Sequence, residues 1–205
     1  HLTLLTQSYY ARLLAVRRVT QDNSGKKTAG IDGIKNLPPM QRLNLVDLLN
    51  KRRLKASPTR RVWVPKPGKD EKRPLGIPTI YDRALQALVK MGMEPEWEAR
   101  FEPNSYGFRP GRSAHDAIEN IYNVIHLSPK YVLDADISKC FDRINHDALL
   151  RKIGKTPYRR LIKQWLKSGV FDNKQFSDTV EGTPQGGIIS PLLANIALHL
   201  SLIHI

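Results

Sequence analysis

The chain has 205 residues, enough for one large domain or two small ones with a sizeable core. Its 33 Lys and Arg against 19 Asp and Glu give a net charge of +14, which indicates a polyanionic partner, nucleic acid before membrane. A generally basic, ribosome-like surface is the alternative. The single cysteine, Cys140, excludes a disulfide framework and a cysteine-based zinc site and fits a reducing compartment. No apolar run in the sequence is long enough to cross a membrane.

The first half of the chain predicts two helices separated by a hairpin. Leucines at near-helical spacing and a basic last turn predict a helix over 41–55. In residues 60–80, RVWV and PLGI are strand-like and PKPGKDEK supplies turn residues, so we expect a hairpin, which its prolines place at a sheet edge. A helix over about 79–93 follows it.

The second half begins with a capping-box pattern, Ser113-Ala-His-Asp116, which predicts the start of a helix. We expect this helix to bury an apolar face made of Ile118, Ile121, Tyr122 and Ile125. The sequence then predicts a strand over 130–137, helices over 146–153 and 157–169, a turn-rich loop over 182–187, and a helix capped by Ser190 with Pro191 as its first residue. Alternating helices and short strands predict a mixed α/β or α+β fold without a flexible linker.

Two carboxylates, Asp134 and Asp136, stand on the predicted strand. Because side chains alternate along a strand, both share one face with Val132, while the apolar residues of the other face pack on a core. These apolar residues are Tyr131, Leu133, Ala135 and Ile137. Neighbouring carboxylates repel each other unless a cation lies between them, so the pair predicts a divalent metal site for phosphoryl transfer, with Mg²⁺ the natural ion. The alternative is an exposed strand face whose solvated acids pair with Lys139 or Arg143.

The predicted hairpin carries six cations against two acids, Asp70 and Glu71. Lys66 and Arg73 lie on opposite arms, where their side chains can converge, and two cations on facing strands can clamp a triphosphate. The alternative is a solvated basic hairpin that touches a nucleic-acid backbone without selectivity. The six cations are Arg60, Arg61, Lys66, Lys69, Lys72 and Arg73.

The loop GTPQGG combines paired glycines with Gln185. The glycines permit close approach of the backbone to a ligand, and the amide of Gln185 offers a donor and an acceptor for a base edge or a sugar. A plain turn ahead of a helix also needs Gly and Pro, so that alternative stays open.

The loop SYGFRPGR, residues 105–112, mixes aromatic and basic side chains. Tyr106 and Phe108 offer faces for bases, while Arg109 and Arg112 offer contacts to phosphates, as in single-stranded nucleic-acid grooves. The alternative is a packed loop whose aromatic side chains are core and whose arginines cap helices.

Taken together and in this order, several stretches resemble the N-terminal part of a group II intron reverse transcriptase, also called a maturase, of bacterial or organellar type. The resemblance covers roughly residues 28–199, nearly the whole chain. The matching stretches are TAGIDGI (28–34), RRVWVPKPGKDEKRPLGIPTIYDRALQ (60–86), FEPNSYGFRPGRSAHDAI (101–118), YVLDADISKCFDRINHDALL (131–150) and EGTPQGGIISPLLANIALH (181–199).

The resemblance implies a catalytic metal site for Mg²⁺, or alternatively Mn²⁺. Asp136 matches the first catalytic metal-binding aspartate of the family's palm, and Ile137 supplies the backbone carbonyl that joins that metal. Asp134 has no metal role in the family, so we expect it to form a hydrogen bond or a salt bridge nearby instead.

The resemblance also assigns nucleotide-binding residues. Lys66 and Arg73 match the residues that hold the incoming triphosphate, and Gln185 matches the glutamine near the nascent base pair. Phe141 falls where the family places the aromatic steric gate against a 2′-hydroxyl, with Cys140 beside it as the alternative register. Nucleic-acid contacts are expected from Arg60, Arg61, Arg109 and Arg112.

The implied architecture is the fingers (1–130) and part of the palm with the fingers–palm helices (131–205) of a right-hand polymerase. The implied partners are an RNA template, a DNA primer, dNTP and group II intron RNA, with no membrane, in a bacterial cytoplasm or an organelle. The family's Ala-Asp-Asp hairpin, with its second carboxylate pair, is missing from the sequence. Both ends of the chain look cut. With one of the family's three metal-binding carboxylates, we expect this piece not to polymerise alone. The alternative is a non-catalytic module that binds intron RNA.

Overall fold

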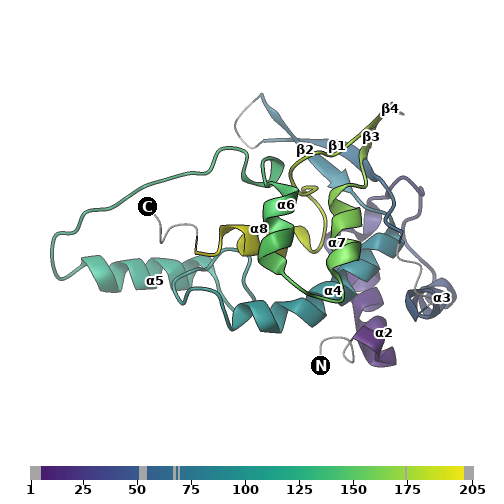
Figure 1. The fold of residues 1–205 in the computed structure, drawn as a ribbon, viewed down its shortest axis with the longest axis horizontal. Coiled ribbons are helices and arrows are strands. Elements are labelled where there is room, and N and C mark those ends of the chain that lie inside the picture. The colour runs from purple at the N-terminus through teal and green to yellow at the C-terminus, as the bar shows by residue number, and fades with distance from the viewer. Residues whose placement is uncertain (1–5, 51–54, 67, 69, 174, 201–205) are drawn as a thin grey trace.

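The computed structural model describes residues 6–50, 55–66, 68, 70–173 and 175–200. It shows a small sheet with helices packed beside it, a mixed α/β fold as the sequence predicts (Figure 1). In chain order the elements are α2 (Tyr9–Arg17), η1 (Arg18–Asp22), η2 (Ser24–Lys27), α3 (Pro39–Asn50), β1 (Thr59–Pro65), β2 (Lys72–Ile77), α4 (Ile80–Glu98), α5 (Ala114–Ile125), η3 (Cys140–Asp142), α6 (His146–Ile153), α7 (Arg159–Leu166), β3 (Val170–Asp172), β4 (Gln175–Ser177) and α8 (Ser190–Leu198).

The sheet has the strand order β2-β1-β3-β4. β1 and β2 form the predicted antiparallel hairpin, and β2, which contains Pro74, is an edge strand, as expected for a proline-containing strand. β1 also pairs in parallel with β3, where Thr59 lies opposite Val170. This pairing joins the hairpin to the chain that follows α7, so segments more than a hundred residues apart form one sheet.

A buried carboxylate on α4 ties the helices to the hairpin. Asp82 is 1% exposed and accepts hydrogen bonds from Thr79 Oγ1 at 2.7 Å and from Ser57 N at 3.2 Å, just before β1. Its other oxygen accepts from Trp165 Nε1 of α7 at 3.0 Å. A buried charge is stable only when it is fully hydrogen-bonded, so this residue fixes α4, α7 and the start of β1 relative to one another.

Most of the predicted helices are confirmed, with small shifts at their ends. α6 has the predicted bounds, whereas α4 continues past the expected end to Glu98 and α3 begins at Pro39. Residues 51–54 of the helix expected over 41–55 lie outside the described residues. α8 is capped by Ile189 rather than Ser190, because the Ser190 hydroxyl donates to Pro184 O at 2.9 Å and is not free to cap the helix.

The expectations for 114–137 are only partly correct. α5 forms with its capping box, since Ser113 Oγ accepts from Asp116 N and Ser113 N donates to the Asp116 carboxylate. Its apolar face is not buried, however: Ile118, Ile121 and Tyr122 are 64%, 57% and 60% exposed. Figure 1 shows α5 and the chain after it extending to one side of the molecule.

The strand predicted over 130–137 is absent from the described structure. Residues 131–137 are extended but pair with no described strand, and Tyr131, Val132 and Leu133 are 108%, 75% and 77% exposed. A strand exists only when a neighbouring strand accepts its backbone hydrogen bonds, and the four-stranded sheet lies elsewhere. The prediction was wrong for this chain because the pattern of a strand does not supply its partner.

Within the described part of the chain, none of the helices has the length and apolar character needed to cross a membrane.

Candidate functional site

The hairpin places Lys66 and Arg73 on one face. Arg73 lies opposite Val64, and side chains alternate between the two faces along each strand. Lys66 is two residues after Val64 and Glu71 is two residues before Arg73, so both share the face of Arg73. Lys66 Nζ lies 2.6 Å from Glu71 Oε2, and the hydrogen bond and charge of Lys66 lower the pKa of Glu71. Both side chains are exposed, so the ammonium group of Lys66 is accessible and can exchange this weak surface partner for a more highly charged one.

The opposite face of the hairpin carries Arg61 and Trp63. The Arg61 guanidinium lies 5.8 Å from the centre of the Trp63 ring, and Trp63 Nε1 donates to Asp172 Oδ2 at 3.1 Å. Arg61 is half-buried and points away from the face of Lys66 and Arg73. If Arg61 contacts nucleic acid, it therefore does so on the opposite side of the sheet from Lys66 and Arg73, the predicted triphosphate clamp.

The loop over 182–187 lies against the free edge of β2. Gly76 N donates to Gln185 O at 2.6 Å. A Cβ on Gly76 would lie 3.0 Å from Pro184 Cβ of the loop, and a Cβ on Gly186, whose φ is +112°, would lie 3.0 Å from Gly76 O. Glycine is therefore required at both positions for the loop to approach the strand this closely. On the far side of the loop, Ile188 N donates to the buried Gln86 Oε1 of α4 at 2.9 Å.

The same loop is bonded to the turn that contains η3. Gly182 N donates to Ile144 O at 2.8 Å, and Thr183 N donates to Phe141 O at 2.7 Å. His146, buried at the start of α6, donates from Nε2 to Gly182 O at 2.6 Å. The loop thus bridges two stretches of sequence, the basic hairpin and the turn after the predicted strand.

This bridge brings the side chain of Gln185 to the turn. Gln185 Nε2 donates to Asp142 Oδ1 at 3.1 Å. The neighbouring Phe141 is half-buried and makes an edge-to-face contact with Phe108, with ring centres 6.0 Å apart. Of the sequence-predicted residues, Gln185, Phe141 and the aromatic residue Phe108 of the 105–112 loop are therefore brought together.

Asp136 lies just before this turn, on the exposed extended segment. Burial, together with the negative charges of Asp136 and Asp142, raises the pKa of the Cys140 thiol, so both carboxylates lie near that sulfur. Lys139 has φ +53°, the left-handed conformation, which reverses the chain between Asp136 and η3. Asp136 and Asp142 are thus held on the two sides of one turn.

The described residues offer only part of a metal site. They contain no group of three or more His, Cys, Asp or Glu side chains close enough to share an ion. Asp136 and the carbonyl of Ile137 are available, whereas Asp142 is engaged by Gln185. Mg²⁺ is commonly held by one or two carboxylates completed by substrate phosphates, so this donor set fits a contribution to a metal site and not a whole one.

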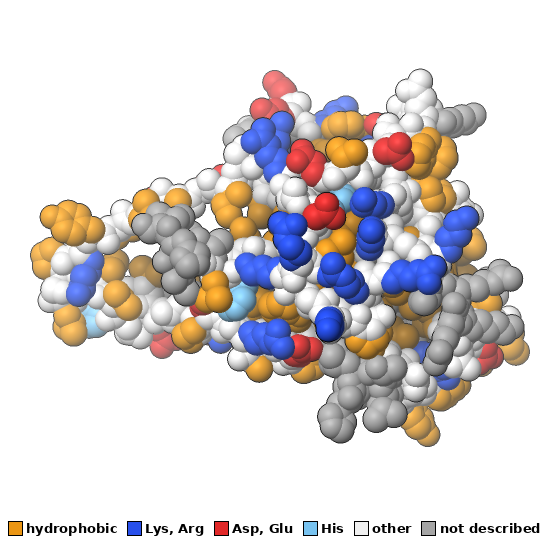
Figure 2. Space-filling view, viewed as in Figure 1, with side chains coloured by type: hydrophobic (Ala, Val, Ile, Leu, Met, Phe, Trp, Pro, Cys, Tyr) orange, Lys and Arg blue, Asp and Glu red, His pale blue; other side chains and the backbone are white. Residues whose placement is uncertain are grey.

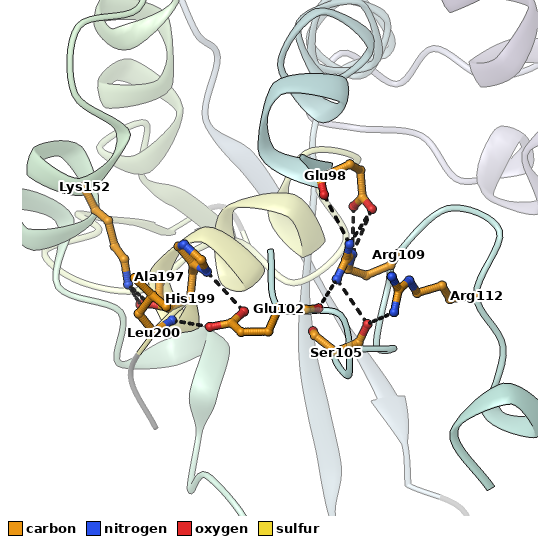
Figure 3. Close-up of polar contacts among 9 residues, drawn as sticks. All are labelled: Glu98, Glu102, Ser105, Arg109, Arg112, Lys152, Ala197, His199 and Leu200. Carbon is orange, nitrogen blue, oxygen red and sulfur yellow. Dashed lines mark hydrogen bonds and ion pairs between the residues drawn. The ribbon is translucent and has the colours of Figure 1, made fainter. Parts of the chain in front are cut away.

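Two of the arginines expected to contact nucleic acid have structural roles (Figure 3). The Arg109 side chain is 2% exposed and is held by the Glu98 carboxylate at 2.8 Å and by the carbonyls of Glu102 and Ser105. Arg112 donates to the carbonyls of Pro103 and Ser105 and lies over the Tyr106 ring. The loop over 105–112 is therefore a packed loop, as in the structural alternative. The backbone carbonyls of this loop and of the residues just before it, which pair with no strand or helix, accept hydrogen bonds from the two guanidinium groups.

Arg60 is likewise engaged within the protein. Its Nε and Nη2 donate to Ala29 O at 2.9 and 2.7 Å, which ties the TAGIDGI stretch to the hairpin. These two contacts use only Nε and Nη2 of the guanidinium, which has five N–H groups, so a phosphate contact by Arg60 stays a prediction. Of the four arginines expected at nucleic acid, only Arg61 is not held by a carbonyl or carboxylate among the residues that the structure describes.

The sequence reasoning missed three residues that position the site. Asp142 orients Gln185, Gln86 holds the end of the loop, and His146 holds its beginning. Asp142 stood in the same acidic stretch as Asp136, but the chain spacing gives no sign of a partner 43 residues away. His146 is the single polar residue on the buried face of α6, which is a signal that could have singled it out, whereas Gln86 shares the buried side of α4 with Asp82 and Arg83.

Comparison with known proteins identifies the family. A family model described as reverse transcriptase (RNA-dependent DNA polymerase) matches residues 64–205, and one described as the N-terminal domain of reverse transcriptase matches residues 2–49. Among solved structures, a Cas6-RT-Cas1–Cas2 complex contains a chain with the same fold, with a TM-score of 0.59 and 23% identity over 94% of this chain and 20% of that one.

The chain is also similar to a group II intron-encoded protein, a maturase-like protein and a third, bacterial protein. It is 42% identical over 146 residues to the group II intron-encoded protein LtrA of Lactococcus lactis subsp. cremoris, covering 69% of this chain and 24% of that protein. It is 37% identical over 211 residues to Protein YkfC of Escherichia coli (strain K12), covering 97% and 55%, and 32% identical over 213 residues to Maturase-like protein 1 of Euglena gracilis, covering 96% and 43%. The chain thus spans about half or less of the length of these relatives. Because the first family model matches more than half of its residues, the chain belongs to the reverse transcriptase (RNA-dependent DNA polymerase) family.

Proposed function

We propose that this chain forms the fingers (1–130) and part of the palm (131–205) of an RNA-directed DNA polymerase, which extends a DNA primer on an RNA template with dNTPs. The observation that carries the proposal is the loop over 182–187. It is hydrogen-bonded both to the basic hairpin and to the turn beside Asp136, so it joins a phosphate-binding element to an acidic one. A nucleotide between them would meet cations, an amide and a carboxylate, the groups that nucleotidyl transfer requires.

Lys66 and Arg73 are assigned to the triphosphate. They share one face of the hairpin, and the only ion pair that involves either of them in the described structure is the surface pair of Lys66 with Glu71. A triphosphate carries more charge than one carboxylate, so it displaces Glu71 from Lys66. The planar guanidinium of Arg73 suits two phosphate oxygens at once.

Gln185 and Phe141 are assigned to the nucleotide's base and sugar. The backbone of Gln185 is fixed on β2 and its side chain on Asp142, so its amide is presented in one orientation. The Phe141 ring is held against Phe108, and a rigid ring can exclude a 2′-hydroxyl by its volume. Both roles depend on side chains that are positioned before a nucleotide arrives.

Asp136 and the carbonyl of Ile137 are the ligands that this chain offers to Mg²⁺, or alternatively to Mn²⁺. When bound, such an ion neutralises charge on the transferring phosphates.

The proposal is tested by Asp136→Asn in a complete protein that includes the Asp-Asp hairpin. The amide has the shape of the carboxylate without its charge, so nucleotide addition should be lost while RNA binding stays near that of the parent. Asp134→Asn, two residues earlier on the same segment, is the matched control and should retain primer extension. Extension by Asp136→Asn within a few-fold of the parent would remove Asp136 from the site.

A second candidate function is non-catalytic binding of group II intron RNA in splicing. It is favoured by the net charge of +14 and by the similarity to Maturase-like protein 1. The two functions differ in their dependence on Asp136. A binding module would support intron splicing equally well with Asp136→Asn, and the complete parent protein would extend no primer.

A further inference from the structure

A second basic surface lies on α6 and α7, apart from the hairpin. Between Ala148 and Phe171 the sequence holds seven Lys and Arg and not one Asp or Glu. Six of the seven are exposed: Arg151, Lys155, Arg159, Arg160, Lys163 and Lys167. Figure 2 shows Lys and Arg side chains gathered at the centre of this face, over the helices that Figure 1 labels α6 and α7. We call these six residues the α6–α7 face.

The amphipathic pattern of α7 fixes the direction of these cations. Leu161, Ile162, Trp165 and Leu166 are 0–3% exposed and form the side that packs on the core. Arg160, Lys163 and Lys167 occupy the opposite stripe at helical spacing, rising by about 4.5–6 Å from one to the next. A whole row of cations is therefore presented outward by a rigid helix.

The cations of this face are not neutralised within the protein. Arg151, Lys155, Arg160, Lys163 and Lys167 form no ion pair with any residue that the structure describes. Arg159 differs, because it donates to the carbonyls of Leu150 and Gly154 and so closes the C-terminal end of α6. Unpaired like charges repel one another, and this repulsion is relieved by a polyanion.

The cations of α6 lie at the end of that helix that is remote from the 182–187 loop, and α7 then returns to the sheet, where Gly169 O accepts from Thr59 N. α6 begins at His146, which is bonded to the 182–187 loop, and its axis then carries the chain about 12 Å from that loop. The cations begin only in the last turn of α6 and continue along α7. A polyanion on this face is thus a different molecule, or a different part of the same molecule, from the one at the hairpin.

The composition of the face indicates a double helix rather than a single strand. Single-stranded sites combine cations with exposed aromatic rings on which bases stack. Here Trp165 is buried, Tyr158 is half-buried, and between Ser138 and Asn173 the described residues include no exposed large hydrophobic side chain. Cations without stacking platforms suit a phosphate backbone whose bases are already paired, and the absence of apolar anchors argues against a membrane surface.

We propose that the α6–α7 face binds the backbone of double-helical RNA at a surface separate from the polymerase site. The commitment to RNA rests on the proposed function, in which the template is RNA. The face would then hold structured RNA on one side of the protein while a different segment lies at the hairpin.

The test is a salt titration of the whole chain with a labelled, blunt-ended RNA hairpin, followed by fluorescence anisotropy. In the test variant Arg160, Lys163 and Lys167 are changed to Gln, which keeps helix propensity and removes three charges. The matched control changes Lys27, Lys35 and Lys130 to Gln, since these exposed lysines lie off the face. We expect the test variant to lose about tenfold or more in affinity at low salt, and the slope of log K against log salt to fall by about 2–3.

The control should keep a slope close to that of the parent. Arg151→Gln with Lys155→Gln, in the last turn of α6 and the connection after it, is a second test variant that should lower the slope by about 1–2. Equal losses in test and control variants, or no loss in either test variant, would overturn the proposal. So would a larger loss for a DNA hairpin of the same sequence, or a loss confined to vesicles that contain phosphatidylserine. The assay contains no primer, dNTP or metal, so its outcome is independent of the Asp136 experiment.

Discussion

Residues of one type take different roles here according to what surrounds them. Arg109 is buried against Glu98 and three loop carbonyls, whereas Arg73 lies on an exposed hairpin face. If a guanidinium that donates to buried carbonyls moved away, those carbonyls would lose their hydrogen-bond donor. This loss costs about 1–3 kcal/mol of free energy for each carbonyl. Burial therefore divides the arginines into structural ones and ones that are available to a ligand.

The hydrogen bond between Gln185 and Asp142 leads to a prediction at the same scale. In the complete polymerase, Asp142→Ala leaves the Gln185 amide without its acceptor, so the amide must be ordered again when each nucleotide binds. A hydrogen bond of this kind contributes about 0.5–1.5 kcal/mol, so KM for dNTP should rise by roughly two- to tenfold, with a smaller change in kcat.

Asp142→Asn is the matched control for that prediction, because its side-chain oxygen can still accept from Gln185. Steady-state kinetics in dNTP compare the three proteins. The positioning role would be contradicted by an unchanged KM in Asp142→Ala, or by Asn and Ala variants that behave alike.

At the scale of elements, α5 and α7 show that amphipathicity and burial are separate properties. Both helices carry an apolar stripe, and α5 has a complete capping box. The stripe of α7 faces α4 and is buried, while Ile118 and Ile121 on α5 face solvent. Most of the free energy of a helix in a protein comes from packing, so the two stripes should contribute very differently to stability.

Alanine substitutions measure that difference. Ile162 of α7 is 0% exposed, so Ile162→Ala should lower the free energy of unfolding by about 2–5 kcal/mol. Ile118 of α5 is 64% exposed, and Ile118→Ala should change it by no more than about 0.5 kcal/mol. Urea unfolding of both variants beside the parent tests this. A large loss for Ile118→Ala would mean that the α5 stripe is buried in solution.

The C-terminal end of α8 is held by polar contacts that depend on pH (Figure 3). The Glu102 carboxylate accepts from His199 Nδ1 at 3.1 Å and from Leu200 N at 2.6 Å. Lys152 donates to the carbonyls of Ala197 and His199. Burial raises the pKa of Glu102, but backbone hydrogen bonds from Glu102 itself and from Leu200, and then His199, outweigh it and lower the pKa from 4.5 to about 2.

A lowered carboxylate pKa means that the folded protein favours the charged form. Its stabilising contribution is therefore fully present above pH 4.5 and is lost as the pH falls toward 2. Glu102→Gln should be less stable than the parent at neutral pH, and this difference should shrink between pH 4.5 and 2. Thermal melting of both proteins across that range tests it. A stability difference that stays constant with pH would show that the charge of Glu102 has no part in holding α8.

At the scale of the whole molecule, the positive charge is divided between two surfaces. The hairpin cations lie beside the bridging loop, and the α6–α7 face lies on helices whose other side forms the core. The net charge indicates that the protein binds a polyanion. It does not give the number of binding sites, because it does not say where the charged side chains lie in the fold. The folded arrangement separates the charges into two surfaces, of which we propose one for a nucleotide and the other for an RNA backbone.

The sequence by itself determined the family, the hairpin and most of the helices. These follow from local signals: turn residues in PKPGKDEK, apolar spacing in α4, α6 and α7, and the order of the motifs. Local patterns act through the backbone conformation of neighbouring residues, so a single sequence carries them completely.

Only the tertiary structure decided which predicted strands were paired and which amphipathic helices were buried. It left 131–137 unpaired and α5 uncovered, because strand pairing and burial require a second surface that no local pattern encodes. It also engaged Arg60 and Arg109 in contacts within the protein and linked Asp142, Gln86 and His146 to the candidate site, through contacts between residues 11 to 102 positions apart. Side-chain identity specified what each residue could bind, and the fold specified which of those groups remained free to bind it.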